Sequence, residues 1–567
     1  MKSNKAVLYP LIGSCVYLML GITLGLLTAT KMIWPGIGEF ELFSFGRIRM
    51  AHTNVVLFGW LLQANIGLLF YIIPKLLHTK LYSQKLALLT WALYNLAALG
   101  GVVSMLMGTG NKAIEYAEIA PPFDYIIALA WVLFAVNIVM TIRQRQVKYM
   151  YVSVWYCVGS LIWTAFVYIT GTFITQLPWI TGVNQANLTW FYVHNAVGLV
   201  FTPLGVSIAY YLIPKELKTP LYSHKLSLIG FWVISFVYVW TGAHHMIHGP
   251  ISYWLQTVAI LFSFSLIIPV VAVITNFLAT FRAAPRDRRM KSAVAKYCYA
   301  GTIFYLLTCL QGPFHSIRMV SVYVSKTDWI VGHAHMALLG GFSFFAFAGF
   351  YYVLPRVLKR PLFSERLANI HFWITLLGSI PFFAVLWVSG VIQGVAWADH
   401  LDVTFLESLR LMKPYHALRW LSGAAIVGGQ LVFLYNIWET LFGVKVPEVS
   451  DTDSSTRDSS MAEGALAWRN LLLKRNLLPW LPAPWASSSS VQSSPRWFHP
   501  WSIGTWSVAV NARFIRIRNK SSVACPFTGV RAASTVTRSR FVPKSPRILN
   551  ALVSAWWMPL PRNPGST

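Results

Sequence analysis

The sequence predicts an all-α protein that crosses a membrane about twelve times, because apolar stretches of about 20 residues, the length a helix needs to cross a bilayer, recur along it. Its 567 residues are 56% hydrophobic and only 11% charged, with a mean hydropathy of +0.56, which excludes an ordinary soluble domain. Helices are expected rather than strands, because a helix satisfies its own backbone hydrogen bonds in lipid.

The apolar stretches fall within the first 443 residues, and we expect the following transmembrane spans: 7–28, 51–74, 86–107, 124–142, 150–171, 189–213, 226–247, 254–280, 296–314, 330–354, 369–394 and 418–442. The first span follows a short basic start, Lys2 and Lys5, and shows no evident cleavage site. We therefore expect it to be a retained span rather than a removed signal peptide.

The loops after the even-numbered spans are basic, and all of them lie on the same side as the N-terminus. Their cations are Lys75, Lys80, Lys85, Arg143, Arg145, Lys148, Lys215, Lys218, Lys225, Arg282, Arg286, Arg288, Arg289, Lys291, Arg356, Lys359, Arg360 and Arg366. Basic loops stay in the cytoplasm, so both termini are expected there. This role accounts for the cations, and we infer no nucleic-acid binding from them.

The five cysteines do not form a recognisable motif. They are far apart, and no C-x-x-C or C-x-x-C-H occurs. A disulfide framework, a zinc knuckle and a covalently attached c-type haem are therefore not expected.

Residues 444–567 form a tail of different composition. From Gly464 to Thr567 there are 14 Lys and Arg residues and no Asp or Glu, and the segment is rich in Ser, Pro and Trp. Two interpretations stay open: a disordered cytoplasmic extension, or the product of a reading-frame shift after residue 460. Disordered segments normally contain few aromatic residues. We assign no function to this tail.

Six histidines fall in the outer portions of four spans. They are His52, His194, His244, His245, His333 and His335. Ionisable residues inside a membrane are costly and usually functional. One such histidine is often an ordinary interior residue, but six at one depth favour metal binding, since imidazole is the commonest transition-metal ligand.

The spacing of His333 and His335 predicts two separate sites. Two positions turn a helix by about 200°, so these two side chains point to opposite faces. One helix can then supply a ligand to a different cofactor on each side.

The adjacent pair His244 and His245 can converge on one metal only near a helix end or distortion. Gly242 and Pro250 bracket such an end. His194 from another span would complete a three-nitrogen site with an open position, suited to copper or non-haem iron.

Two other chemistries fit the histidines less well. A zinc hydrolase normally needs a carboxylate base nearby, and these spans offer almost none. A histidine proton relay in a transporter does not explain the opposed pair together with the doublet.

Several separated motifs resemble one family in order and spacing. They are "FGRIRMAHTN", "YVHNAVGLVFTP", "YVWTGAHH", "TDWIVGHAHMALLG" and "VSGVIQGVAW…PYHALRW". They resemble subunit I of the haem–copper oxidases, specifically the C-family or cbb3-type cytochrome c oxidases, over about residues 10–443. The resemblance implies a haem–copper oxidase subunit I-like bundle for a transmembrane domain at 1–443, with the tail outside it.

The resemblance also implies two haem b groups and one copper ion. His52 and His335 would be the axial ligands of a low-spin haem b, and His333 the ligand of a high-spin haem b. His194, His244 and His245 would bind the copper ion.

Further roles follow from the same resemblance. Arg47, Arg49 and Arg419 would bind haem propionates, since guanidinium suits a carboxylate. Tyr238, six residues before His244, matches the family's redox-active tyrosine, which implies a covalent link to a copper-ligand histidine, expected to be His194. Tyr211, Ser235 and Thr241 are candidates by position for proton uptake, although buried hydroxyls commonly serve helix packing.

The implied activity is reduction of dioxygen to water, coupled to proton translocation, in the bacterial inner membrane. Electrons would come from c-type cytochrome subunits of the same complex. A nitric oxide reductase is one alternative, but its non-haem iron has a glutamate ligand four residues after the first histidine, where this chain has Gly198. A non-enzymatic haem-binding membrane or assembly protein is another.

One residue departs from the family's pattern. In "LQGPFHSIR" the family commonly has glutamate where this chain has Gln311. Glutamine carries no charge and exchanges no proton near neutral pH. His315 is the nearest residue that could substitute for the glutamate, and a surface role unrelated to the site is the alternative for it.

Overall fold

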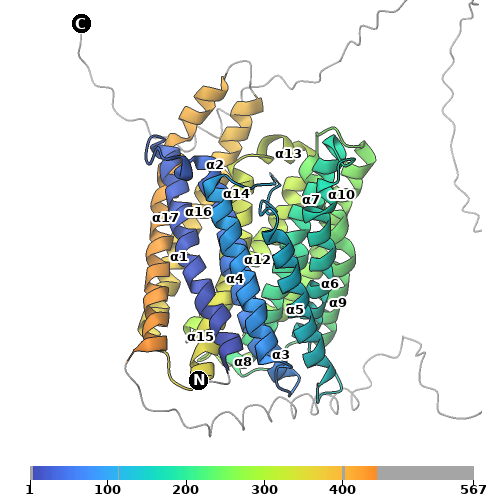
Figure 1. Cartoon of the computed structure of the whole chain (residues 1–567), viewed down its shortest axis with the longest axis vertical. Coiled ribbons are helices and arrows are strands. Elements are labelled where there is room, and N and C mark those ends of the chain that lie inside the picture. Colours follow the sequence, from blue (N-terminus) through green and yellow to red (C-terminus); the bar gives the residue numbers. More distant parts are fainter. Residues whose placement is uncertain (1–3, 113, 399–402, 444–567) are drawn as a thin grey trace, which may run out of the picture. The chain divides into compact units, whose positions relative to one another are not determined.

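The computed structural model describes residues 4–112, 114–398 and 403–443 (Figure 1). Within these ranges all regular secondary structure is helical, and twelve helices or helix groups are long and apolar enough to cross a membrane. The predicted all-α, twelve-span architecture is confirmed. The tail predicted at 444–567 lies outside the described residues.

The elements in chain order are α1 (Lys5–Ile33), η2 (Glu41–Phe43), α2 (Phe45–Asn54), η3 (Val55–Leu62), α3 (Gln63–Leu76), α4 (Gln84–Met107), α5 (Phe123–Arg143), α6 (Val152–Thr172), η4 (Ile174–Gln176), α7 (Gly182–Asn195), η5 (Ala196–Phe201), α8 (Thr202–Leu217), α9 (His224–Val237), η6 (Tyr238–Trp240), η7 (Gly242–Met246), α10 (Tyr253–Ser265), α11 (Ile267–Ala283), α12 (Ala293–Ser316), α13 (Arg318–Val324), α14 (Asp328–His335), η8 (Met336–Ser343), α15 (Phe344–Leu358), α16 (Glu365–Ala398) and α17 (Phe405–Phe442). Spans two, six and ten are composite: α2–η3–α3, α7–η5–α8 and α14–η8–α15.

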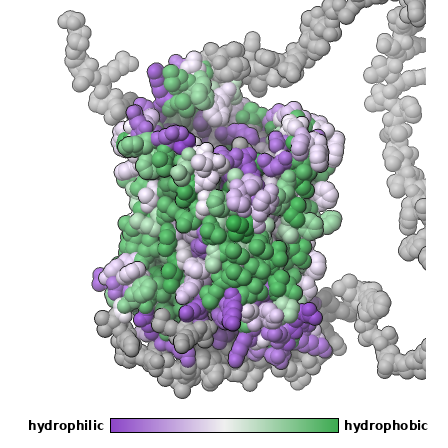
Figure 2. Space-filling model, in the orientation of Figure 1, coloured by the Kyte–Doolittle hydropathy of each residue, from purple (hydrophilic) through white to green (hydrophobic). Residues whose placement is uncertain are grey.

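The surface matches a bilayer. Figure 2 shows a hydrophobic band across the middle of the visible face, with hydrophilic residues gathered at both ends. Spans two, six and ten are the interior ones: 83%, 94% and 89% of the residues in their most apolar windows are buried, against 61% or less in the other described spans. Four of the six histidines lie on these three interior spans, and His244 and His245 lie on span seven.

The last span is longer than hydropathy predicts. It was expected to start at residue 418, but α17 begins at Phe405. Thr404 caps it in a capping box with Glu407, and the added turns carry charged residues that hydropathy excludes. The C-terminal end of α16 and the N-terminal end of α17 project beyond the neighbouring helices (Figure 1).

Each interior span ends in the same motif, which the sequence analysis did not detect. The three copies read "YIIPKLLHTKLYS", "YYLIPKELKTPLYS" and "YYVLPRVLKRPLFS". A residue with positive φ ends each helix: His78 (52°), Lys218 (48°) and Lys359 (53°). The final serine then accepts a hydrogen bond from a backbone N–H in the first turn of the next helix.

An asparagine two spans further on holds each motif from both sides. The Oδ1 atoms of Asn137, Asn276 and Asn436 accept from the backbone N–H of the three serines at 3.2, 2.9 and 3.1 Å. Their Nδ2 atoms donate to the carbonyls of the same serines at 2.9, 2.7 and 2.9 Å. The described bundle is therefore three repeats of four spans.

The three repeats also share a π-helical segment in the interior span. η3 begins three residues after His52, and η5 begins two residues after His194. η8 begins directly after His335. Segments of this kind are frequent at functional sites. A π-turn changes the phase of the helix, so the histidine-bearing turns can face one set of neighbours and the following turns another.

Replacing Asn276 with Ala should lower the thermal stability of the purified complex. The substitution leaves the paired backbone groups of Ser223 without partners, at a cost of about 1–3 kcal/mol. Asn95→Ala is the control, because that side chain donates to Trp91 within its own helix. Equal melting temperatures for the two variants, measured by differential scanning fluorimetry, would contradict the role given to the asparagine bridge.

Candidate functional site

The six histidines lie on α2, α7, η7 and α14, and Figure 1 shows α2, α7 and α14 near the end of the bundle opposite the N-terminus. They form two groups. His52 pairs with His335, and His194 groups with His244 and His245, while His333 lies on the other side of α14 from its neighbour His335.

The His52 and His335 rings each present one free nitrogen. Nδ1 of His52 lies 2.8 Å from the Gly21 carbonyl, and Nδ1 of His335 lies 2.8 Å from the Val331 carbonyl. A carbonyl only accepts hydrogen bonds, so both Nδ1 atoms carry the proton and both Nε2 atoms keep a lone pair. This is the tautomer that a metal-ligating histidine needs.

The separation of these two rings fits one metal between them. Their centroids are 6.3 Å apart and their planes differ by 16°. Two imidazoles on opposite sides of one metal ion have centroids about 6 Å apart, given metal–nitrogen bonds of about 2.0 Å. Gly25 gives His52 its place, because a Cβ there would lie 2.6 Å from the His52 ring.

The second group is a compact trio. One nitrogen from each of His194, His244 and His245 lies within 4.8 Å of the others, and Nδ1 of His194 is 3.0 Å from Nε2 of His245. The Nε2 atoms of His194 and His244 are buried without a hydrogen-bond partner among the described residues. Such orphaned nitrogens are costly unless a metal or another group binds them. An all-imidazole donor set suits copper.

A break in span seven lets the adjacent histidines converge, as the spacing argument requires. The α-helix ends at Val237, and the chain continues as 3₁₀ turns that carry His244 and His245. Gly242 permits this approach, because a Cβ there would lie 2.8 Å from the Trp190 carbonyl. His244 Nδ1 is fixed by Ser263 Oγ at 2.7 Å.

Trp190 covers His245. The two rings stack at 4.3 Å with 13° between their planes, and the Lys326 ammonium lies 4.3 Å from the centre of the indole. Burial lowers the pKa of Lys326, and Glu115 opposes the shift. The cation sits at an exposed position beside the trio, in contact with an aromatic face.

His333 faces α12 rather than α2. Its Nδ1 lies 3.0 Å from Gln311 Oε1, and its ring meets the His315 ring at 4.7 Å and 82°. His315 also contacts His244 at 5.8 Å. The surface role considered for His315 is wrong, because this side chain is buried between His333 and the trio.

Tyr238 lies against His194, with ring centroids 4.7 Å apart and 19° between the planes. The absence of a side chain at Gly198 makes this possible. A Cβ at Gly198 would lie 1.7 Å from Tyr238 Cζ. The phenol ring therefore occupies the space that any side chain at residue 198 would need.

Each of the three candidate arginines pairs with a carboxylate of the chain. Arg47 pairs with Glu41, Arg49 with Glu115 at 2.7 Å, and Arg419 with Asp328 at 3.4 Å. Arg47 also donates to the Leu106 carbonyl. Arg49 and Arg419 both lie near enough to His52 to act on it electrostatically, and Arg419 acts on His335 as well. Of the three, Arg419 has the least exposed side chain and is the one that acts on both His52 and His335.

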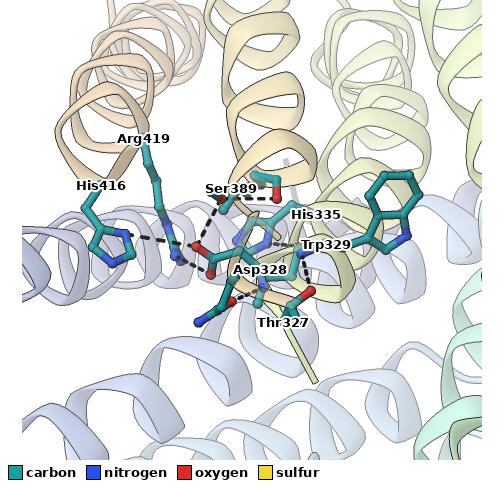
Figure 3. Close-up of polar contacts among 10 residues, drawn as sticks. Thr327, Asp328, Trp329, His335, Ser389, His416 and Arg419 are labelled. Atoms are coloured by element: carbon teal, nitrogen blue, oxygen red, sulfur yellow. Dashed lines mark hydrogen bonds and ion pairs between the residues drawn. The ribbon is translucent and has the colours of Figure 1, made fainter. Parts of the chain in front are cut away.

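Asp328 is a site-supporting residue that the sequence analysis missed. Figure 3 shows its carboxylate directed at Arg419, His416 and Ser389. Ser389 Oγ donates a hydrogen bond to it at 3.2 Å, and His416 Nδ1 lies 4.0 Å away, too far for a hydrogen bond. Its own N–H donates to Gln393 at 2.9 Å. Asp328 thus ties the first turn of α14 to α16 and α17, which sets the position of His333 and His335. The sequence did offer one signal for this role: an acidic residue at the start of an apolar span, directly after the N-cap residue Thr327.

Two of the proton-path candidates bond within their own segment. Ser235 Oγ donates to the Phe231 carbonyl at 2.5 Å, and Thr241 Oγ1 donates to the Tyr238 carbonyl at 2.6 Å. The Tyr211 ring meets the Tyr352 ring edge-on at 6.0 Å. These contacts are those of helix packing, and the proton path stays a prediction.

Gly198→Ala should destabilise the protein only when residue 238 has an aromatic ring. Overpacking at this contact costs about 1–3 kcal/mol. The same substitution in a Tyr238→Ala background should cost far less, because the clashing ring is gone. Gly428→Ala is the control, since a Cβ there meets nothing within 4 Å. Equal losses of melting temperature in both backgrounds would refute the contact.

Comparisons with known proteins agree with this geometry. Residues 5–425 match the family described as Cytochrome C and Quinol oxidase polypeptide I. The chain is 31% identical over 461 residues to the Cbb3-type cytochrome c oxidase subunit CcoN1 of Stutzerimonas stutzeri, covering 79% of this chain and 96% of that one. It is 29% identical over 454 residues to a cytochrome c oxidase subunit 1 homolog of Agrobacterium tumefaciens (strain T37), covering 78% and 84%.

A solved structure shares the fold. A cryo-EM structure of a heme-copper terminal oxidase dimer superposes with a TM-score of 0.66 at 16% identity, covering 79% of this chain and 86% of that one. The chain therefore belongs to the cytochrome c and quinol oxidase polypeptide I family, and it is a haem–copper terminal oxidase subunit of the cbb3 type.

Proposed function

We propose that the two histidine groups on either side of α14 hold two haem b groups and one copper ion. His52 and His335 bind the low-spin haem iron through Nε2, and His333 binds the high-spin haem iron through Nε2. His194, His244 and His245 bind copper. Two observations together support this assignment. The ring centroids of His52 and His335 are 6.3 Å apart, which leaves room for one metal ion between them, and His194, His244 and His245 form a separate compact group.

Bound at these positions, the high-spin haem iron and the copper ion would supply the site at which dioxygen is bound and reduced by four electrons and four protons to two waters. The chain's own groups orient this site. Ser263 and Gln311 fix the rings of His244 and His333. Trp190 packs on His245 and excludes water from that side.

Tyr238 is the proposed internal donor of a proton and an electron. Its ring lies beside His194, which has one nitrogen directed at His245 and the other buried without a partner among the described residues. A covalent link from a Tyr238 ring carbon to His194 would satisfy that second nitrogen and leave the other for copper. The link would replace a ring C–H bond and an imidazole N–H bond, and the two electrons and two protons released would pass to dioxygen, the substrate of the proposed activity. Protons would reach Tyr238 from the cytoplasmic side, with Tyr211, Ser235 and Thr241 as proposed relay positions.

Gly198 favours oxygen reduction over nitric oxide reduction. A glutamate at this position would be a ligand to non-haem iron in the reductases that the sequence motifs also resemble. Here Tyr238 fills the same space, and a Cβ at Gly198 would lie 1.7 Å from its ring. The all-nitrogen trio then suits copper better than iron.

The chain is a multi-pass subunit of a bacterial oxidase complex with further subunits. We propose that c-type cytochrome subunits of this complex donate the electrons, and that both termini lie in the cytoplasm. The basic loops after the even-numbered spans support this orientation. Electrons would then pass from the outer face of the membrane to the metal sites, and their transfer would be coupled to proton translocation.

The three arginines are proposed haem-propionate partners in addition to their ion pairs. A guanidinium has five N–H donors and can serve two carboxylates at once. Arg419 is best placed, because it pairs with Asp328 (Figure 3) and acts electrostatically on both His52 and His335.

Single histidine variants should separate the metal sites. We expect two haem b and one copper per chain in the purified complex, copper loss with both haems retained in His244→Ala, and loss of the low-spin haem in His52→Ala. His224→Ala is the control, because its ring packs on Tyr151 at the start of α9, at the opposite end of that span from His244 and His245. Metal analysis by mass spectrometry and haem extraction would measure this. Non-haem iron in place of copper would overturn the proposed function.

A further inference from the structure

The last turns of α12 enclose the His333 ring. Gln311 and His315 are four residues apart and so lie on the same helix face. Gln311 Oε1 is 3.0 Å from His333 Nδ1, and the His315 ring stands at 82° to the His333 ring at 4.7 Å. A Cβ at Gly312 would just touch His333 Cε1, at 4.0 Å. One helix end thus fixes both the hydrogen bond and the plane of this imidazole.

The hydrogen bond at His333 has a defined direction. The amide oxygen of Gln311 only accepts, so His333 Nδ1 donates and Nε2 keeps its lone pair. An amide cannot take the proton. A carboxylate at the same place would draw the proton towards itself and give the ring imidazolate character.

The charge on a ligand decides how well the oxidised metal is stabilised. Hydrogen bonds from a ligating histidine to an outer partner raise the basicity of the ligand, and a carboxylate does so more strongly than an amide. A more basic ligand stabilises the ferric state and lowers the reduction potential of the iron. A neutral acceptor has the opposite effect.

We propose that Gln311 is a positioning residue that keeps His333 a neutral, weakly polarised ligand, so that the high-spin haem has a higher reduction potential than a glutamate at this position would allow. The proposal rests on the proposed function, because it takes His333 as the haem ligand. It assigns the departure at residue 311 a redox role in this chain. His315 supports it by holding the plane of the ring.

The test compares Gln311→Glu with the unsubstituted, fully loaded complex. We expect the midpoint potential of the high-spin haem to fall by at least about 59 mV. For one electron, this shift changes the equilibrium constant for electron transfer between the two haems tenfold. The iron–histidine stretching frequency in the resonance Raman spectrum of the reduced protein should rise. The low-spin haem serves as the internal reference and should keep its potential.

Gln256→Glu is the matched control. It makes the same change of charge in a buried glutamine whose Oε1 accepts from His248 N–H and which contacts none of the six histidines in the hydrogen bonds of the described residues. It should leave the iron–histidine frequency unchanged. An equal shift in both variants would mean that charge alone acts, and would overturn the proposal.

Gln311→Met is a second variant that tests the same hydrogen bond if the Gln311→Glu protein does not assemble. It keeps the size of the side chain and removes the acceptor, so the iron–histidine frequency should fall. An unchanged frequency and potential in either Gln311 variant would refute the proposal. His333→Ala separates the two levels of inference: retention of both haems in that variant would refute the proposed function itself, whatever the Gln311 variants show.

Discussion

A hydrogen bond at Nδ1 determines which nitrogen each of three histidines, the proposed haem ligands, can offer to a metal. Gly21, Val331 and Gln311 each provide an oxygen that accepts from one imidazole, belonging to His52, His335 and His333 respectively. Each bond fixes the tautomer and the ring orientation, and it leaves Nε2 as the metal-binding atom. Two of the acceptors are backbone carbonyls, whose placement depends on helix position, so the chemistry of the site depends directly on how the helices pack.

That packing comes from a threefold repeat. In each repeat an interior span carries a histidine, a π-helical segment and a terminal Pro-basic motif that an asparagine clamps to a later span. The clamps lie at one end of the bundle and the histidines near the other. Glycines at the close contacts, such as Gly25 beside His52 and Gly198 beside Tyr238, let these rings pack at the distances that the proposed metal sites need.

The sequence predicted the spans and the depth of the histidines because both depend on one-dimensional properties, hydropathy and the alternation of helix direction. The opposed directions of His333 and His335 followed from helix geometry alone. The partners of these residues did not follow. Asp328 binds Arg419 across 91 positions and Gln311 meets His333 across 22, and no local pattern specifies such pairs. The early start of α17 was missed because its first turns are amphipathic. The repeated "LYS" and "LFS" motif was visible in the sequence and could have been found by comparing the chain with itself.

The most direct test of this account is the identity of the nitrogen bound to the low-spin haem iron. Cryo-electron microscopy of the loaded complex, at a resolution that defines the imidazole rings, would show it. The account predicts iron midway between His52 and His335, bound by Nε2 of each, with both Nδ1 atoms on the Gly21 and Val331 carbonyls. Iron bound through Nδ1, or held by only one of these histidines, would contradict it.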